Sequence, residues 1–270
     1  MKMHAILTKE TRLEEWFFLS LRRLTKQVSP RSFGIAFLCL FAVKAGANPL
    51  GEPFPQERDA LWQKAVSIRS AEELSAPSIL KYVQYELDSS GAEKSREQGV
   101  WAFSYDLNGK ATIRVVEAVK DGKDFTEERK RRLSRGRSNA SRMLDILSPF
   151  DSSAQPVLKL GDPLEKSVKG KVVREFPFQL PQEERKMVGF AWVDPISGNP
   201  IGFQYTISPL PWFVDKMEIQ VWFDAENRPG LFREVSYSFA ASFLVFSWIG
   251  GGIAWPSDWI RLTMKPRFGN

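Results

Sequence analysis

Histidine and cysteine are almost absent from the 270-residue sequence. The only histidine is His4 and the only cysteine is Cys39, and both lie within the first 47 residues. Residues 48–270 therefore lack the side chains of a Ser-His-Asp triad, a cysteine nucleophile, a Cys/His zinc site or a disulfide. Such a chain must be held together by its apolar core, and this stretch is long enough to build one sizeable domain.

The first 47 residues have the pattern of an export signal. Arg31 precedes the apolar run 33–43, and a site of the A-x-A type ends at Ala47. A basic flank, a short apolar core and small residues at the cleavage site are typical of a secretory signal peptide. We therefore predict a leader over residues 1–47, cleaved after Ala47, and a single domain over 48–270.

Three alternatives for this leader remain open. Translation could begin downstream of the first methionine, and the apolar run could be a buried segment of the fold. Cys39 could carry a lipid, but lipidation signals place a small residue before the cysteine and Leu38 is not small. A signal peptide fits these residues better than either a buried segment or a lipid anchor.

The excess of basic charge also belongs to the leader. The whole chain has 38 Lys and Arg against 32 Asp and Glu, and residues 1–47 contain eight of the basic and three of the acidic residues. The predicted domain is thus close to neutral. A globally basic surface for nucleic acid is not expected.

Alternation of apolar and polar residues predicts antiparallel strands along most of the domain. Asn108-Gly109 and the stretch 195–200 have the composition of hairpin turns. Helical spacing predicts a helix over 57–74, and acidic residues near Phe125 predict the start of another. The polar stretch 89–98 is interpreted as a loop. Strands are predicted over 79–88, 99–107, 110–120, 169–180, 185–194, 201–207 and 217–224.

The carboxy-terminal segment needs a choice between strand and membrane helix. No charge occurs from Val235 to Ser257, and an uncharged run of this length is also compatible with a transmembrane helix. Serines alternate with aromatic residues in its first half, however, and three glycines at 250–252 would weaken a helix. We predict a strand, a glycine turn near Gly250 and a last strand from Asp258 to Lys265.

A hairpin in the middle of the chain carries a resemblance to a known family. The residues from Gly189 to Pro200 read Gly-Phe-Ala-Trp-Val-Asp-Pro-Ile-Ser-Gly-Asn-Pro. This string resembles a hairpin of the LolA-like superfamily, the outer-membrane lipoprotein-sorting proteins of the bacterial periplasm. The resemblance covers about residues 185–265. It implies a half-open β-barrel with a helical lid that carries acyl chains in an apolar hollow.

The expected fold class is α+β, because strands far outnumber helices and follow one another through turns. We predict a curled antiparallel sheet of roughly nine or more strands, with two or three helices packed on or capping it. Helices against one face of a curled sheet leave an apolar hollow, the usual setting of a ligand site. Aromatic residues on the predicted strands are the candidates to line it: Trp101, Phe103, Tyr105, Phe190, Trp192, Phe203, Tyr205 and Trp222.

A run of arginines is the candidate contact surface. No acidic residue occurs between Arg129 and Arg142. Such a run could meet an anionic membrane surface or an acidic partner protein, and it could equally be a solvated helix. The arginines considered for contact are Arg129, Arg131, Arg132 and Arg135.

The expected function is a periplasmic, non-enzymatic carrier or binder of a lipid or acylated protein, without cofactor, metal or nucleic acid. The alternative is an envelope interaction or sensor module with the same fold and a filled core. A carboxylate hydrolase is a third hypothesis. Its candidate acids, Asp194 and Asp224, are better explained as turn residues at strand ends.

Overall fold

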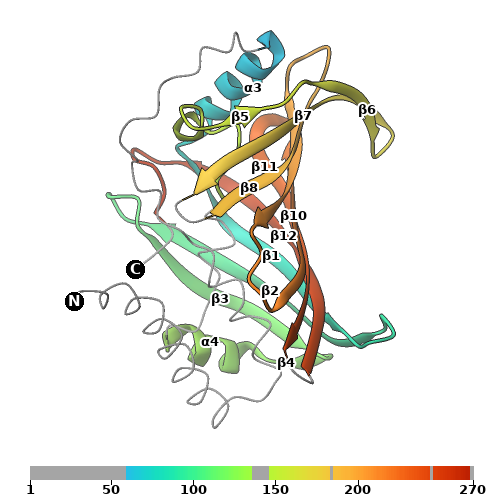
Figure 1. Cartoon of the computed structure of the whole chain (residues 1–270). Helices are drawn as coiled ribbons and strands as arrows, with labels where there is room; N and C mark the ends of the chain where they lie inside the picture. The colour runs from blue at the N-terminus through green and yellow to red at the C-terminus, as the bar shows by residue number, and fades with distance from the viewer. Residues whose placement is uncertain (1–58, 136–145, 183–184, 244–245, 268–270) are drawn as a thin grey trace, which may run out of the picture. The chain divides into compact units, whose positions relative to one another are not determined.

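A computed structural model describes residues 59–135, 146–182, 185–243 and 246–267, all of which belong to one compact unit. These residues form a twelve-stranded, open sheet in which neighbouring strands pair antiparallel, together with two α-helices, α3 and α4 (Figure 1). The predicted α+β class, with an antiparallel sheet and helices, is confirmed. The predicted leader and its cleavage site lie outside the described residues.

The sheet is a meander whose first and last strands meet. Along the sheet the order is β4-β3-β2-β1-β12-β11-β10-β9-β8-β7-β5, with β6 paired to β7. The strand β1 therefore lies between β2 and β12, and the two ends of the domain close onto each other inside the sheet. The strands are β1 (Ser75–Leu87), β2 (Glu93–Tyr105), β3 (Ala111–Lys120), β4 (Lys123–Asp124), β5 (Lys159–Leu160), β6 (Leu164–Val168), β7 (Lys171–Gln182), β8 (Arg185–Val193), β9 (Pro200–Ser208), β10 (Val214–Asp224), β11 (Arg228–Phe243) and β12 (Phe246–Arg261).

The helix α3 (Ala60–Ala71) begins at a side-chain cap and buries one stripe. The Asp59 carboxylate accepts a hydrogen bond from the Leu61 N–H at 2.9 Å, which satisfies one of the free amides of the first turn. Trp62, Ala65 and Arg69 are the buried residues, spaced three and four apart so that they share one face of the helix. The predicted helix is confirmed, but its buried stripe includes an arginine.

The helix α4 (Thr126–Ser134) begins where the acidic residues predicted it. Glu127 and Glu128 occupy its first turn, where they face the positive end of the helix dipole. Its only buried residue is Arg129. Leu133 adds a partly buried apolar contact to the same core, so α4 is held by one buried arginine and a small apolar face.

One row of side chains crosses nine strands and forms the centre of the core. Its members are successive register partners on β7, β8, β9, β10, β11, β12, β1, β2 and β3, so they all point to the same face of the sheet. All except Gly99 are buried. The row consists of Phe176, Ala191, Phe203, Val221, Val235, Ala254, Tyr82, Gly99 and Ala118.

Both helices lie on the face that this row defines. The Trp62 ring of α3 packs edge-on against Phe176 with centroids 5.2 Å apart, and the Arg129 guanidinium of α4 lies 5.7 Å from the Tyr82 ring centroid. Since Phe176 and Tyr82 are members of the same row, we call this side the helix face and the other the opposite face.

Two sequence predictions about secondary structure are wrong. The predicted glycine turn at Gly250 is the middle of β12, and the last hairpin turns instead where Phe243 pairs with Phe246. The predicted loop 89–98 is largely strand, because β2 begins at Glu93. No helix among the described residues is long and apolar enough to cross a membrane.

Candidate functional site

The helix face has two ends, each closed by a helix that inserts a buried arginine. Under α3, the Trp62 ring lies 4.7 Å from Phe150 and hydrogen-bonds Gln155 Oε1 through its Nε1–H at 3.1 Å. Phe150 in turn meets Phe223 edge-on at 5.8 Å. The end beneath α3 is therefore filled by aromatic side chains and by the segment that contains Phe150.

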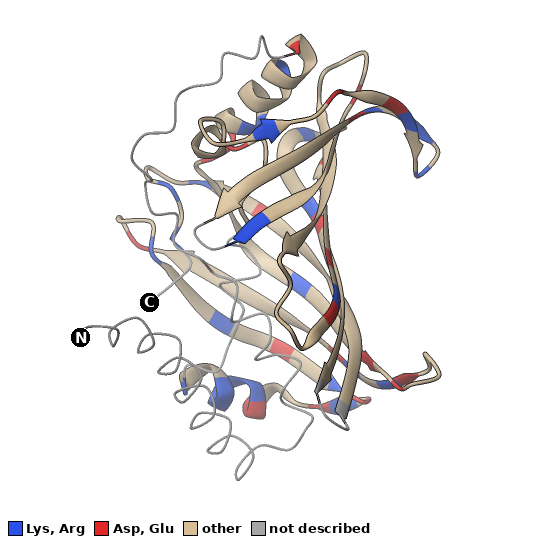
Figure 2. Cartoon of the chain, viewed as in Figure 1, with Lys and Arg blue, Asp and Glu red and all other residues tan. Residues whose placement is uncertain are grey.

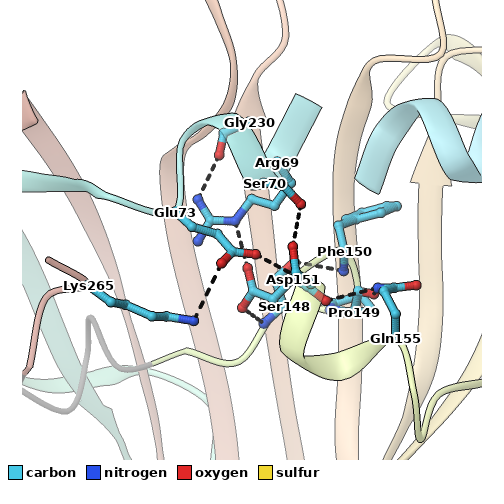
Figure 3. A network of polar contacts seen from close by, with 11 residues as sticks. Arg69, Ser70, Glu73, Ser148, Pro149, Phe150, Asp151, Gln155, Gly230 and Lys265 are labelled. Atoms are coloured by element: carbon cyan, nitrogen blue, oxygen red, sulfur yellow. Dashed lines mark hydrogen bonds and ion pairs between the residues drawn. The ribbon is translucent and has the colours of Figure 1, made fainter. Parts of the chain in front are cut away.

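The buried arginine of α3 donates hydrogen bonds from two of its nitrogens (Figure 3). Arg69 donates from Nε to Asp151 Oδ1 at 2.9 Å and from Nη1 to the Gly230 carbonyl at 2.9 Å. The second oxygen of Asp151 accepts the Ser148 N–H at 2.9 Å, and the Arg69 guanidinium lies 4.6 Å from the Phe232 ring centroid. Fully paired buried charges of this kind fix the position of a loop.

The buried arginine of α4 is only partly paired. Arg129 Nε lies 3.3 Å from Glu97 Oε1, without the geometry of a hydrogen bond. Both side chains are at least 95% buried. The same Glu97 oxygen already accepts the Tyr82 hydroxyl at 2.8 Å. One oxygen of Glu97 thus serves both neighbours.

Four polar atoms of this cluster are buried without any hydrogen-bond partner. They are Glu97 Oε2, Trp101 Nε1, and Nε and Nη1 of Arg129. Leaving a buried donor or acceptor unpaired costs about 1–3 kcal/mol, and more for a charged group. We call the four side chains Tyr82, Glu97, Trp101 and Arg129 the α4 polar cluster.

The surroundings of the α4 polar cluster are apolar. Leu80, Phe103, Val115 and Ala118 form a buried group together with Tyr82 and Trp101, whose rings lie 4.5 Å apart. Burial, followed by the charge of Glu97, holds the pKa of the Tyr82 hydroxyl far above its ordinary value. Burial does the same for Tyr237, with a further contribution from Glu97. Tyrosine therefore remains a hydrogen-bond donor here.

The predicted arginine surface is wrong at its first residue. Arg129 points into the core, as described above. Arg131 and Arg132 both pair with Glu128, at 2.9 and 3.0 Å, and Arg135 is the exposed residue that ends the helix. Figure 2 shows basic and acidic residues together on α4.

The structure divides the aromatic cavity candidates between the two faces of the sheet. Trp101, Phe103, Tyr105, Phe203 and Tyr205 lie on the helix face, as their register and their core contacts show. Phe190, Trp192 and Trp222 lie on the opposite face. The eight residues therefore do not line one cavity.

The central hairpin has the predicted turn. The Asp194 carboxylate accepts hydrogen bonds from the N–H groups of Ile196 and Ser197, at 2.9 and 2.6 Å. Burial pushes the pKa of Asp194 up, but these hydrogen bonds outweigh it and the pKa lies below its ordinary value. Asp224 likewise accepts from Asn227 in the next turn. Both acids cap turns, as the sequence predicted.

Sequence reasoning missed the α4 polar cluster, although one signal was present. Glu97, Gly99, Trp101 and Phe103 alternate on β2, so the glutamate occupies a position in phase with the apolar side chains. A charged residue in the apolar phase of a strand indicates a buried polar partner. The sequence contains no comparable signal that the Arg129 side chain points into the core.

Comparisons with known proteins find distant likenesses among solved structures. No protein-family model matches the sequence, and no curated protein matches it. Among solved structures, a crystal structure of MucB in complex with MucA(peri) is 11% identical with a TM-score of 0.21, over 71% of this chain and 92% of that chain. The complex of Pseudomonas aeruginosa MucA/MucB is 11% identical with a TM-score of 0.22, over 74% of this chain and 99% of that chain. Likenesses of this size assign neither a family nor a function.

Proposed function

We propose that this protein is a non-enzymatic carrier of the bacterial periplasm that holds the apolar chain of a lipid or acylated molecule against the helix face. The observation that supports it is the extent of the apolar surface on that face. The nine-strand row is followed along the strands by a further row of apolar side chains, among them Leu180, Met187 and Ile207, which are buried. The half-open barrel implied by the hairpin resemblance belongs to the same proposal.

The chain would lie along a strip two rows away from the position of Trp62. Leu180, Met187 and Ile207 are successive register partners on β7, β8 and β9, and Met217 shares their face on β10. The strip is about 13 Å along β7 from Phe176, given the rise per residue of a strand. Methionine side chains are flexible and adapt to irregular apolar ligands. A wall with two methionines suits an acyl chain.

The direct test is mass spectrometry of a solvent extract from the protein purified as cells make it. A lipid or acylated compound present in near-stoichiometric amount is the expected result. Lipid-free protein that also fails to take up an environment-sensitive naphthylamine dye would contradict the carrier function. Replacing Met187 with a lysine would weaken dye uptake, whereas Lys186→Met on the opposite side of the same strand would leave it unchanged.

A second candidate function is a protein-interaction module with a filled core. It is favoured by the aromatic packing beneath α3, where the Trp62 ring contacts both Phe150 and Phe176. The exposed arginines of α4, Arg131 and Arg135, would then meet an acidic partner. Charge reversal at both positions is expected to abolish capture of that partner and to leave dye uptake intact.

A further inference from the structure

The four unpaired atoms of the α4 polar cluster are a stronger pointer to a ligand than any other polar feature of the described residues. From them we infer that the cluster is a binding site for a neutral amide group at the head of an apolar chain. The inference rests on the proposed carrier function and adds the head-group chemistry that the carrier recognises.

The cluster is built from three elements that meet on the helix face. Tyr82 comes from β1, Glu97 and Trp101 come from β2, and Arg129 comes from the first half of α4. The Arg129 guanidinium lies 5.3 Å from the Trp101 ring centroid. It therefore sits over the indole, and its Nε lies 3.3 Å from Glu97 Oε1.

The comparison with Arg69 shows that a buried arginine can dock a helix on this face without an unpaired atom, whereas a single unpaired donor, Arg174 Nε, lies at the α3 end. Arg69 and Asp151 are also buried, yet neither has an unpaired buried side-chain atom. Both arginines dock a short helix onto the same sheet. Docking a helix thus does not require the unpaired donors and acceptor that the α4 polar cluster keeps, and buried polar groups in native proteins are normally satisfied by protein, water or ligand.

The charge of the cluster selects a neutral ligand. Arg129 and Glu97 carry one positive and one negative charge in an apolar surrounding. A carboxylate or an ammonium group would add a third, unbalanced charge there, and burying an unbalanced charge is costly. Charged head groups are therefore disfavoured relative to neutral ones.

The unpaired atoms then select an amide over an ester. Trp101 Nε1 and the Arg129 nitrogens are donors, whereas Glu97 Oε2 is an acceptor. An ester can only accept hydrogen bonds and would leave Glu97 unpaired. An amide carbonyl accepts from the indole or the guanidinium, and the amide N–H donates to Glu97, so an amide satisfies both kinds of atom.

The apolar chain attached to the amide can continue along the same face. Val115 and Ala118 on β3 and Phe103 on β2 surround the cluster with apolar side chains. Tyr237 also packs against this group and belongs to β11. This strand lies between the cluster and the strands β7 to β10, which bear the strip with Met187 and Met217. Head group and chain would therefore occupy one continuous apolar face.

The experiment compares three ligands with the same chain and different heads. Dodecanamide, methyl dodecanoate and dodecanoate are titrated against the full-length protein, and each is scored by displacement of the bound naphthylamine dye. Dodecanamide is expected to bind about tenfold more tightly than the ester, the effect of one or two hydrogen bonds to charged or buried groups. Dodecanoate is expected to bind more weakly than the amide.

Three variants locate the preference at the cluster. Arg129→Met removes the guanidinium, and Trp101→Phe removes the indole N–H while keeping an aromatic ring. Each is expected to reduce the amide-to-ester preference to within about twofold. Arg131→Met, on the exposed side of the same helix, is the matched control and should keep the full preference. Far-UV circular dichroism verifies that each variant is folded.

Each outcome supports the amide inference, overturns it, or overturns the carrier function. Amide preference in the wild type that disappears in Arg129→Met or Trp101→Phe supports the inference. Equal binding of amide and ester by the wild type overturns it and leaves the carrier function standing, with the cluster holding water. Preference that survives in both variants also overturns it. Failure of lipid-free protein to bind the dye and all three ligands removes the carrier function itself.

Discussion

Trp192 and Trp222 stack on each other across Gly202, with ring centroids 5.1 Å apart and ring planes inclined by 18°. The two indoles come from β8 and β10, which do not pair, and Gly202 on the intervening β9 is the register partner of both. Because glycine has no side chain, the indoles meet above its backbone. Both tryptophans are buried, whereas Phe190 on the same face is 41% exposed.

Polar groups hold the stack from both sides. Trp192 Nε1 donates to Glu175 Oε2 at 2.9 Å, and Lys169 Nζ lies 3.9 Å from the centroid of the Trp222 ring. A cation above an indole and a satisfied indole N–H both favour this arrangement. The stack is therefore a structural feature of the sheet, which explains why Trp192 and Trp222 do not serve the cavity predicted from sequence.

Gly202→Ala is expected to destabilise the protein by about 1–3 kcal/mol, the usual cost of overpacking. A Cβ at this position would lie 2.5 Å from the Val221 carbonyl oxygen and 3.2 and 3.4 Å from atoms of the two indoles. The measurement is urea unfolding, with near-UV circular dichroism to follow the indole pair.

Thr206→Ala is the matched control for that substitution. Thr206 lies on the same strand and the same face as Gly202, and its loss should change stability by less than about 0.5 kcal/mol. A Gly202→Ala protein that keeps both the wild-type midpoint and the wild-type near-UV spectrum would contradict the stacking role.

Arg69→Met is expected to destabilise the protein by about 3–5 kcal/mol. The substitution leaves Asp151 as a buried carboxylate without its ionic partner, and breaking a buried pair from one side is strongly unfavourable. Thermal or urea unfolding measures the change.

Arg228→Met serves as the comparison for Arg69→Met. Arg228 pairs with Glu72 at 3.0 Å, but its side chain is 47% exposed. Exposed pairs contribute about 0–1 kcal/mol, so this variant should unfold close to the wild type. Equal effects of the two substitutions would show that the Arg69 network does not fix the segment beneath α3.

Local signals in the sequence predicted the elements that local chemistry determines. The hairpins at Asn108-Gly109 and at 195–200 follow from turn formers, and the start of α4 follows from the acidic residues of its first turn. Gly109 has φ = 73°, a conformation that favours glycine. These features depend on a few neighbouring residues, which is why they could be read directly.

The predictions that failed concern segments whose structure depends on partners distant in sequence. The glycines 250–252 look like a turn in isolation, yet they lie within β12 because aromatic side chains of neighbouring strands fill the space above them. A Cβ at Gly252 would lie 2.8 Å from Tyr237 Cε1, and a Cβ at Gly251 would lie 2.6 Å from the Tyr85 hydroxyl oxygen. Pairing of β1 with β12, which brings Tyr85 there, has no local signature.

The predictions about the candidate site divide in the same way. Alternation correctly placed Trp101, Phe103 and Tyr105 on one face of a strand, but it could not decide which strand faces share one side of the sheet. That choice is made by register across several strands. The inward turn of Arg129 depends on Glu97, more than thirty residues earlier in the chain.

Four of the five tyrosines are expected to resist ionisation while the protein is folded. Burial raises the pKa of Tyr82, Tyr105, Tyr205 and Tyr237 far above the ordinary value of about 10. A group with a raised folded-state pKa contributes stability that is complete below the unfolded pKa and is lost as the pH rises towards the folded value. The protein should therefore lose stability above about pH 10.

Ultraviolet difference spectroscopy of the phenolate band checks this tyrosine prediction. Between about pH 10 and 11 the folded protein should show far less phenolate absorbance than the same protein in denaturant. The remaining signal should then appear together with unfolding. Full ionisation of all five tyrosines in protein that is still folded would contradict the burial of these hydroxyls.

Protonation of Asp194 is expected to weaken the central hairpin at acid pH. Its folded-state pKa is below the ordinary value, because hydrogen bonds from the Ser197 and Ile196 N–H groups outweigh the opposite effect of burial. Such a carboxylate contributes stability that is complete above the unfolded pKa of about 3.9 and is lost as the pH falls through the folded value.

Asp194→Asn keeps an oxygen acceptor but cannot titrate. At neutral pH the wild type should be more stable than this variant by about 1 kcal/mol, and the difference should shrink below about pH 4. Urea unfolding of both proteins across this pH range gives the difference directly, since the other acids titrate alike in both. A difference that stays constant down to about pH 3 would show that the charge of Asp194 does not stabilise the turn.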